Sequence, residues 1–396
     1  MNQEHLVSSP TTITHVETIR HPAWPRFTWL RIYSSDGYFG LGEVGHFAVA
    51  GEAVLHDLAA RFLVGADPTR IDQLWTRIHD HLRIFTVGGS ELRALGAIDV
   101  ALWDLRGRQL GVPCFDLLGG RSRDVIPVYN TCIGNPGMED DRQFITDAGT
   151  LAADLWDQGF RCMKVWPFDP FAAKSHGARI DDRDLATALD TVRSIRERVG
   201  RRMGIAVELH GFWNLPTAVR IARALEPYDV EWIEEAVSPE SIQSQAEFAR
   251  SCASPVVSGE RLATRFAFRA LLEHGAADII NPDLTWTGGM GELHRIAAMA
   301  EAWRRPIKPH NEGGPVHHTA CAHVAASVPS LYLLEVIRSN LAVLFPQVAS
   351  GYPDLVAPAG AGDEVMLALP SGPGLGITLN PTVTDSPETV RRVTAI

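Results

Sequence analysis

Two arrangements of hydrophobic residues divide the chain. In the first part, Phe27–Ser34 and Tyr38–Val44 alternate as strands do, and Ser35-Asp36-Gly37 between them is typical of a tight turn. Glu91–Gln109 carries hydrophobic residues at helical spacing, and Gly and Pro residues follow its end. These elements predict an α+β domain over residues 1–124.

From residue 125 onward, short hydrophobic runs alternate regularly with amphipathic stretches such as Asp182–Val199, Pro216–Leu225 and Gly289–Trp303. Eight strands that alternate with helices predict a (β/α)8-type barrel over residues 125–345, and a doubly wound sheet is the competing arrangement. The predicted strands are Val125–Asn130, Arg161–Trp166, Met203–Leu209, Val230–Ile233, Pro255–Ser258, Ala277–Ile280, Pro306–Lys308 and Leu331–Val336.

The regular alternation ends before residue 346, and prolines and glycines cluster in the remaining residues 346–396. This segment is too long for a frayed terminus, so we expect it to pack back on the first domain. The predicted fold class is therefore α/β, with a barrel and a smaller α+β domain built from both ends of the chain.

Composition narrows the function classes. Hydrophobic residues make up 45% of the 396 residues, and the net charge is −11 without a Lys/Arg run, which argues against a nucleic-acid partner. Five scattered cysteines predict reduced thiols in a cytoplasmic protein. The N-terminus lacks the hydrophobic core of a signal peptide, and the longest stretch without Asp, Glu, Lys or Arg contains His and Pro, which argues against membrane insertion.

Acidic residues end three consecutive predicted strands. Glu234 follows Glu208 by 26 residues, and Glu260 follows Glu234 by the same number, so one βα unit separates each from the next. In a barrel, this spacing brings the three carboxylates together at the C-terminal rim, where barrel active sites lie. Clustered anions repel one another unless a cation lies between them, and oxygen ligands without thiolates favour Mg²⁺ or a similar ion. The alternative is three solvated loop acids.

The series of polar strand ends continues with Asp283, His310 and Glu335 after the sixth, seventh and eighth strands. A carboxylate on one strand end can orient an imidazole on the next and raise its basicity, which predicts His310 as a general base with Asp283 as its partner. A structural role for His310 is the competing interpretation.

With this series in place, the chain resembles the enolase superfamily, mandelate racemase subgroup, over essentially its whole length. The resemblance rests on residues 97–104 (AIDVALWD), on 117–120 (LLGG), and on short motifs in the barrel and tail. The short motifs in the barrel and tail are Trp232-Ile233-Glu234-Glu235, Ser258-Gly259-Glu260, Pro282-Asp283, Pro309-His310 and Gly372-Pro373-Gly374-Leu375-Gly376. The resemblance implies a modified (β/α)7β barrel covered by a capping domain.

The resemblance also implies a chemistry: removal of the proton α to a carboxylate, with Mg²⁺ stabilising the anion that forms. It implies Glu208, Glu234 and Glu260 as the Mg²⁺ ligands, Glu335 as a hydrogen-bonding group for the substrate carboxylate, and Glu235 as an acid behind the ligands.

Three positions depart from the family pattern. Glu208 stands where the first ligand is usually Asp. Lys164-Val165-Trp166 stands in place of Lys-x-Lys, which keeps Lys164 as a donor to the substrate carboxylate but loses a common base. Trp286 occupies a position where related racemases and cycloisomerases often have Lys. Racemisation between opposed lysines is therefore disfavoured.

The acid sugar dehydratases of the subgroup are the better match. In them, a His two residues after the first ligand can serve as the acid, and here that residue is His210. His310-Asn311 with Gly313-Gly314-Pro315 also resembles their seventh-strand motif. We expect His310 to take the α-proton and His210 to protonate the departing β-hydroxyl, with anti stereochemistry; a structural His210 is the alternative.

We therefore predict a Mg²⁺-dependent dehydratase, a carbon–oxygen lyase, that converts an aldonate-type sugar acid to a 2-keto-3-deoxy acid, and a homo-oligomer. A racemase, epimerase or cycloisomerase on the same scaffold is the first alternative, and a non-catalytic binding barrel is the second. We expect substrate selection by residues Gly45–Ala53, Phe85–Gly89 and Pro167–Ile180.

Overall fold

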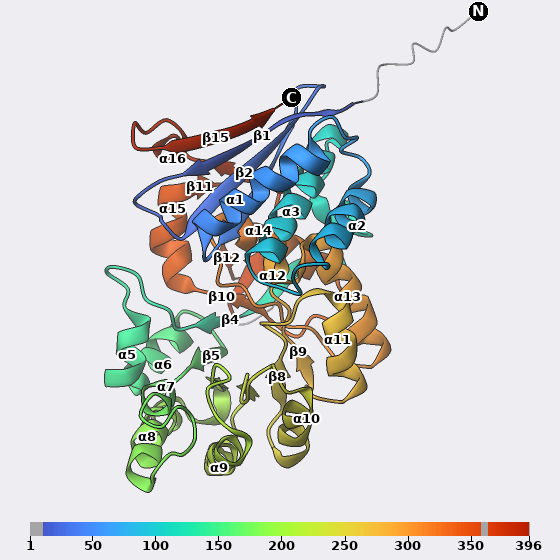
Figure 1. Cartoon of the computed structure of the whole chain (residues 1–396). Coiled ribbons are helices and arrows are strands. Elements are labelled where there is room, and N and C mark those ends of the chain that lie inside the picture. The colour runs from blue at the N-terminus through green and yellow to red at the C-terminus, as the bar shows by residue number, and fades with distance from the viewer. Residues whose placement is uncertain (1–10, 358–362, 396) are drawn as a thin grey trace, which may run out of the picture.

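The smaller domain contains an antiparallel sheet of four strands in the order β15-β1-β2-β3 (Figure 1). The computed structural model describes residues 11–357 and 363–395. Strand β2 occupies the residues predicted for it, whereas β1 and β15 were not predicted. The strands are β1 (Ile13–Arg20), β2 (Phe27–Ser34), β3 (Phe39–Gly45) and β15 (Val390–Ala395).

Helix α3 (Ser90–Leu110) packs on β3 and forms the centre of the capping domain. The two backbones approach closely because β3 has glycines at the contact: a Cβ on Gly40 would overlap the carbonyl oxygen of Ala101, and one on Gly42 would overlap that of Ala97. The neighbouring helices are α1 (Ala48–Leu58), η1 (Ala59–Leu63), α2 (Ile71–Leu82) and α4 (Cys114–Leu117).

The larger domain is a closed parallel barrel. Each strand pairs with the next, and β10 pairs with β4 to close the ring. The seventh predicted strand, Pro306–Lys308, is reduced to isolated bridges from Ile307 to Ile280 and Leu331. The other strands are β4 (Val125–Thr131), β5 (Cys162–Val165), β6 (Gly204–Glu208), β7 (Trp232–Glu234), β8 (Val256–Ser258), β9 (Ile279–Ile280) and β10 (Leu334–Val336).

Helices separate successive barrel strands and surround the ring, which gives the predicted α/β class (Figure 1). Asp181 caps the N-terminus of α8, whose bounds match the prediction. These helices are α5 (Asp140–Thr146), α6 (Ala148–Asp157), α7 (Asp169–Ala172), α8 (Asp182–Val199), η2 (Gly200–Arg202), α9 (Leu215–Leu225), η3 (Glu226–Tyr228), α10 (Ile242–Ser251), α11 (Thr264–Glu273), α12 (Leu284–Thr287), α13 (Met290–Ala302) and α14 (Pro315–Ser327).

The C-terminal part of the chain contacts both domains. Strand β13 pairs antiparallel with β4 of the barrel, and β15 pairs with β1 of the capping sheet. The backbone of Gly374 pairs with Val112 and Cys114 beside α3. The elements after β10 are η4 (Asn340–Leu344), α15 (Phe345–Val348), β11 (Ala349–Ser350), β12 (Leu355–Val356), β13 (Met366–Ala368), β14 (Thr378–Leu379) and α16 (Pro381–Thr384).

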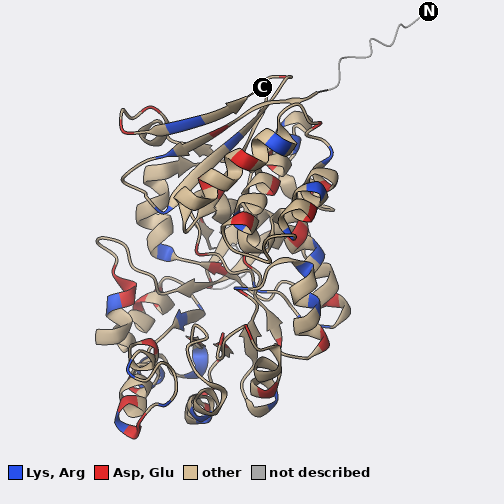
Figure 2. Ribbon diagram, in the orientation of Figure 1, with Lys and Arg blue, Asp and Glu red and all other residues tan. Residues whose placement is uncertain are grey.

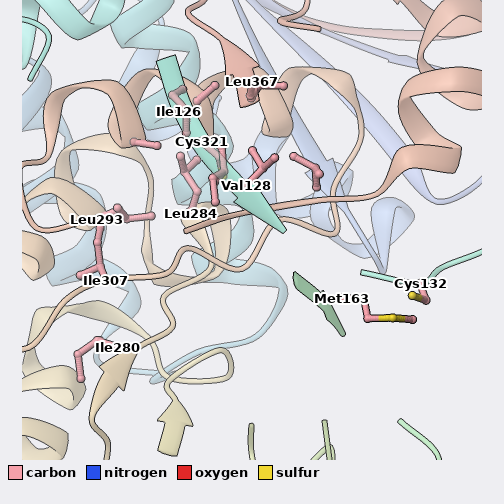
Figure 3. Packing of buried hydrophobic residues seen from close by; sticks show 14 of the residues in the cluster. Ile126, Val128, Cys132, Met163, Ile280, Leu284, Leu293, Ile307, Cys321 and Leu367 are labelled. Atoms are coloured by element: carbon pink, nitrogen blue, oxygen red, sulfur yellow. The ribbon is translucent and has the colours of Figure 1, made fainter. Parts of the chain in front are cut away.

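The main hydrophobic core lies between the barrel strands and the elements around them. Figure 3 shows part of it, where Ile126 and Val128 of β4 lie near Cys321 of α14 and Leu367 of β13. Inside the ring, Tyr129 and Trp232 pack edge to face with ring centroids 5.1 Å apart. These aromatic rings fill the barrel interior, so the polar residues at the strand ends rest on a packed base.

Charged residues of both signs are interspersed along the outer helices of the two domains (Figure 2). This distribution differs from the basic face that a nucleic-acid-binding surface requires. Within residues 11–357 and 363–395, no helix is both long and apolar enough to cross a membrane.

Candidate active site

Three carboxylates meet at the C-terminal ends of β6, β7 and β8. The side chains of alternate residues point to the same side of a strand, and the register pairs Glu208 directly with Glu234. Glu260 follows β8 by two residues. Ligand oxygens of Glu208, Glu234 and Glu260 all lie within 4.8 Å of one another, and all three residues are buried. The spacing in the sequence therefore corresponds to one cluster in space.

Glu234 is surrounded by hydrogen-bond donors. Its carboxylate lies 2.8 Å from Lys164 Nζ and 3.2 Å from Lys308 Nζ, and it accepts hydrogen bonds from Asn281 Nδ2 and Trp232 Nε1. Burial alone would raise the pKa of Glu234, but the two lysines outweigh this effect and lower the pKa to about 2. Glu234 is therefore a permanent anion that is held in one position.

Glu208 behaves differently. Its burial, and then the nearby anion of Glu234, raise the pKa of Glu208 to about 8. The all-oxygen donor set and this excess of anionic groups fit a hard divalent cation such as Mg²⁺, which would favour the ionised form of Glu208. Glu208, Glu234 and Glu260 are the residues that could hold it.

Glu235, next to Glu234, has a supporting position. Its Oε1 accepts hydrogen bonds from Ser258 Oγ (3.0 Å), Gly259 N (2.7 Å) and Glu260 N (3.3 Å). Glu235 thus fixes the backbone that carries Glu260.

His310 and Asp283 form a hydrogen-bonded pair at the ends of adjacent strands. Their backbones form a parallel bridge, and His310 Nδ1 lies 2.8 Å from Asp283 Oδ2. Asp283 Oδ1 also accepts hydrogen bonds from the backbone N–H groups of Thr285 and Trp286, both at 2.9 Å, and so caps α12. Because Nδ1 is engaged, Nε2 is the ring nitrogen left for the cavity.

The environment of His310 favours its protonated form. Burial lowers the pKa of His310, but the carboxylates of Glu260, Asp283 and Glu335 outweigh burial and raise it to about 10. A cation held by Glu260 would oppose this rise and move the imidazole towards the neutral form that a general base requires.

His210 lies just beyond the end of β6. Its Nδ1 is 2.7 Å from Asp169 Oδ2, on the segment that follows β5. Burial lowers the pKa of His210, whereas the carboxylates of Glu208 and Asp169 raise it, with a net result of about 9. The sequence places His210 at the site but does not identify Asp169, which lies within the expected link 167–180.

Lys164 and Glu335 lie against the acid cluster. Lys164 Nζ is 3.0 Å from Glu335 Oε1 and 3.4 Å from Glu208 Oε2. Glu335 Oε2 accepts a hydrogen bond from the backbone N–H of Asn311 at 2.8 Å. Each of the residues that the sequence nominates is thus found around one cavity or in direct contact with a residue that lines it.

This active-site cavity has a volume of about 290 Å³. Glu312 lies at its edge and connects it to the capping domain: the Glu312 carboxylate lies 2.5 Å from Arg26 Nη2 and 2.8 Å from His46 Nε2. The residues that line the cavity are Thr131, Ile133, Lys164, Trp166, Glu208, His210, Glu260, His310, Glu312 and Glu335.

Lys308 and Glu312 were not identified from the sequence. Lys308 precedes His310 by two residues and shares its strand face, a signal that could have found it. Glu312 has no such signal, because its partners come from separate loops of the capping domain.

A closed barrel with three clustered carboxylates and two imidazoles at its C-terminal rim defines an enzyme site. Two family descriptions match the chain. Residues 147–383 match "Enolase C-terminal domain-like", and residues 7–119 match "Mandelate racemase / muconate lactonizing enzyme, N-terminal domain". The chain belongs to the enolase superfamily, in the mandelate racemase subgroup, and it is an enzyme.

Individual relatives agree with this assignment. A D-galactonate dehydratase from Ralstonia nicotianae is 35% identical over 79% of this chain and 78% of its own. An enolase of the mandelate racemase subgroup from Agrobacterium tumefaciens is 34% identical, with a TM-score of 0.88 over 97% of this chain and 99% of its own. An enolase protein from Sargasso Sea environmental sequencing is 37% identical, with a TM-score of 0.89 over 98% of this chain and 99% of its own.

Proposed function

We propose that this protein is a Mg²⁺-dependent dehydratase of an aldonate-type sugar acid. The observation that carries the proposal is the presence of two imidazoles, on the third and seventh barrel strands, each with Nδ1 held by an aspartate and both lining the cavity beside the acid cluster. A dehydration needs two proton transfers, one from carbon and one to oxygen, and this site contains one candidate for each. The dehydratase name of the Ralstonia relative supports the same reaction class.

The substrate carboxylate would lie in the cavity beside the ion pair of Lys164 and Glu335. Lys164 offers a buried ammonium group, and the carboxylates of Glu208, Glu234 and Glu260 would hold Mg²⁺ beside it. Bound Mg²⁺ would supply positive charge that offsets the negative charge developing on the substrate carboxylate as the α-proton leaves. Burial raises the pKa of Glu335, but Lys164, His310 and Lys308 outweigh burial and hold this pKa well below its usual range. Glu335 is therefore ionised, and it would order Lys164 against the substrate carboxylate.

His310 Nε2 would then accept the α-proton, while Asp283 holds the imidazole through Nδ1. The C–H electron pair first delocalises into the substrate carboxylate as an enolate, whose α-carbon can regain a proton that has exchanged with solvent. The same electron pair then forms the new bond between the α- and β-carbons as the β-carbon–oxygen bond breaks. His210 would donate its Nε2 proton to the departing hydroxyl, which leaves as water. The enol that remains tautomerises to a 2-keto-3-deoxy acid.

The stereochemistry of this elimination follows from the positions of the two imidazoles. His310 lies at the end of the seventh strand and His210 at the end of the third, so they approach the substrate from opposed sides of the ring. We therefore propose anti elimination.

A screen of acid sugars, including D-galactonate, tests the proposal when the keto acid product is detected with semicarbazide. Dehydration of at least one monocarboxylic sugar acid, lost on removal of Mg²⁺ and restored by its return, is the expected outcome. Racemisation or epimerisation without loss of water across the library would contradict it and would favour the alternative activity of this scaffold.

A further inference from the structure

The cavity contains a second Asp–His pair besides Asp283–His310. His210 Nδ1 lies 2.7 Å from Asp169 Oδ2, and the corresponding distance between His310 Nδ1 and Asp283 Oδ2 is 2.8 Å. Both rings line the active-site cavity, and both use Nδ1 for the carboxylate contact. The same arrangement thus occurs on two sides of the cavity, and in each pair the aspartate follows the barrel strand that precedes the strand of the histidine.

The backbone of His210 is held as firmly as its ring. Its φ of 49° lies in the left-handed region, which is uncommon for a residue other than glycine. The backbone N–H of His210 donates to Glu208 Oε1 at 2.9 Å, and its carbonyl oxygen accepts from Arg261 Nη1 at 2.7 Å. Contacts to the N–H and to the carbonyl oxygen of His210 hold this unfavourable backbone conformation. They indicate that the fold keeps the His210 ring in one position.

The side chain of Asp169 makes a single polar contact among the described residues. Its Oδ2 contacts His210, while its Oδ1 is buried and finds no hydrogen-bond partner among the described residues. A purely structural carboxylate normally satisfies both oxygens, since leaving a buried oxygen unpaired costs free energy. Asp169 is the first residue of α7, a helix of a single turn, and its carboxylate is directed at the imidazole.

We propose that Asp169 is the positioning residue for His210: it accepts a hydrogen bond from Nδ1–H, holds the ring of the doubly protonated imidazolium in one orientation and so directs the Nε2 proton towards the departing hydroxyl. This inference rests on the proposed dehydration and assigns to the second proton transfer the kind of support that Asp283 gives to the first. Because Asp169 acts through His210, its loss impairs departure of the hydroxyl and leaves removal of the α-proton intact.

The first test compares two rates in Asp169→Ala, Asp169→Asn and wild type, with the sugar acid found in the screen. For Asp169→Ala, we expect dehydration to fall by about 10- to 100-fold, the size of effect seen when the carboxylate that orients a metal-bound histidine is removed. Exchange of the α-proton with solvent deuterium should stay within about twofold of wild type, because that step uses His310. Asp169→Asn keeps an acceptor oxygen, so its dehydration rate should lie between those of Asp169→Ala and wild type.

A substrate analogue separates positioning from a general disturbance. Fluoride leaves as an anion with less need of a proton than hydroxide, so the 3-deoxy-3-fluoro analogue should restore most of the lost rate in Asp169→Ala. The matched control is Asp184→Asn. Asp184 lies in α8 and forms an ion pair with Lys174 of the link that carries Asp169, but no contact joins Asp184 to His210 among the described residues. It should change neither the ratio of exchange to dehydration nor the preference for fluoride.

A measurement without substrate keeps the inference testable even if no sugar acid is dehydrated. In protein labelled with ¹⁵N-histidine, the ring signals of His210, assigned by their loss in His210→Asn, report its tautomer and the Nδ1 hydrogen bond. We expect these signals to change in Asp169→Ala and not in Asp184→Asn. Unchanged His210 signals, or an equal loss of exchange and dehydration, would overturn the role of Asp169. Failure of the substrate screen alone would overturn the proposed function.

Discussion

At the scale of single residues, the three acids of the cluster are not equivalent. Glu234 has four donors around it, two of them buried lysines, whereas the basic neighbours of Glu260 among the described residues are farther away, with His310 Nε2 at 3.8 Å and Arg261 Nε at 3.7 Å. Removing one partner of a buried ion pair is costly because it leaves the other charge uncompensated. A change at Glu234 therefore affects folding as well as metal binding.

Glu260→Gln is for this reason the sharper test of the metal site. We expect Mg²⁺ affinity, measured by isothermal titration calorimetry, to fall by at least about tenfold, with the thermal midpoint of the metal-free protein nearly unchanged. Glu234→Gln should weaken Mg²⁺ binding and also lower that midpoint. Undiminished Mg²⁺ affinity in Glu260→Gln would remove this residue from the ligand set.

His310→Asn should abolish exchange of the substrate α-proton with solvent deuterium and lower kcat by about 10²- to 10⁴-fold, because no base remains to accept the proton. The measurement is deuterium incorporation followed by NMR, and His274→Asn, a change at an exposed helix end, is the control. If exchange continues at the wild-type rate in His310→Asn, another residue is the base.

How much of the site the sequence predicts depends on where each contact comes from. Glu208, Glu234 and Glu260 recur once per βα unit, so the barrel prediction alone brings them together. Asp169 begins the single-turn helix α7 and Glu312 lies in a loop, and their partners come from another barrel unit or from the other domain. Periodicity carries no information about such contacts, and only the folded chain reveals them.

At the scale of elements, long amphipathic helices were predicted best. The 18 residues of α8 carry a capping aspartate and a sustained helical period, so both ends are marked in the sequence. Short elements behaved differently: the seventh barrel strand has only single bridges, because its pairing is made at Ile307 and Asp283–His310 and not along a ladder. Strand β15 was missed because most of its residues are exposed and lack alternation.

Asp104 shows how one buried side chain joins three elements. Its carboxylate accepts hydrogen bonds from the backbone N–H groups of Leu41 in β3 and Leu375 in the tail, both at 2.7 Å, and from Arg108 Nε of its own helix, α3, at 2.9 Å. The Asp104 side chain is fully buried. It therefore fixes the tail and the sheet to the same helix.

Asp104→Ala would leave two buried N–H groups without acceptors, and each such loss costs about 1–3 kcal/mol. We expect a free energy of unfolding lower by about 2–5 kcal/mol, measured by urea denaturation. Asp116→Ala, at an exposed position of the neighbouring α4, should change it by less than about 0.5 kcal/mol. Equal effects in the two variants would show that the contacts of Asp104 do not stabilise the fold.

At the scale of the whole molecule, the capping domain reaches the active-site cavity through the contacts of Arg26 and His46 with Glu312. Burial would raise the pKa of Glu312, but His46 and Arg26 outweigh it and lower the pKa to about 2. Glu312 is therefore ionised at neutral pH. The connection between the two domains lies at the edge of the active-site cavity.

Weakening this connection should impair substrate binding more than chemistry, since Glu312 is distinct from the groups proposed to transfer protons. For Arg26→Ala and Glu312→Gln, we expect KM to rise by about tenfold, with kcat within about threefold of wild type. The reason is that the lost contact would weaken the binding of the substrate and of the transition state equally. The double variant should be little worse than either single variant, because all three lose the same contact. A fall in kcat at unchanged KM would contradict this interpretation.

The antiparallel pairing of β1 with β15 has a consequence for biosynthesis. The register joins His15 to Ala395 and Arg20 to Val390, so strands from opposite ends of the polypeptide lie side by side. A ribosome releases β1 early and β15 last, with every barrel strand made in between. The capping sheet thus gains its outer strand only after the whole barrel has been synthesised, and a chain terminated before β15 would leave the edge of β1 open to aggregation and to quality-control proteases.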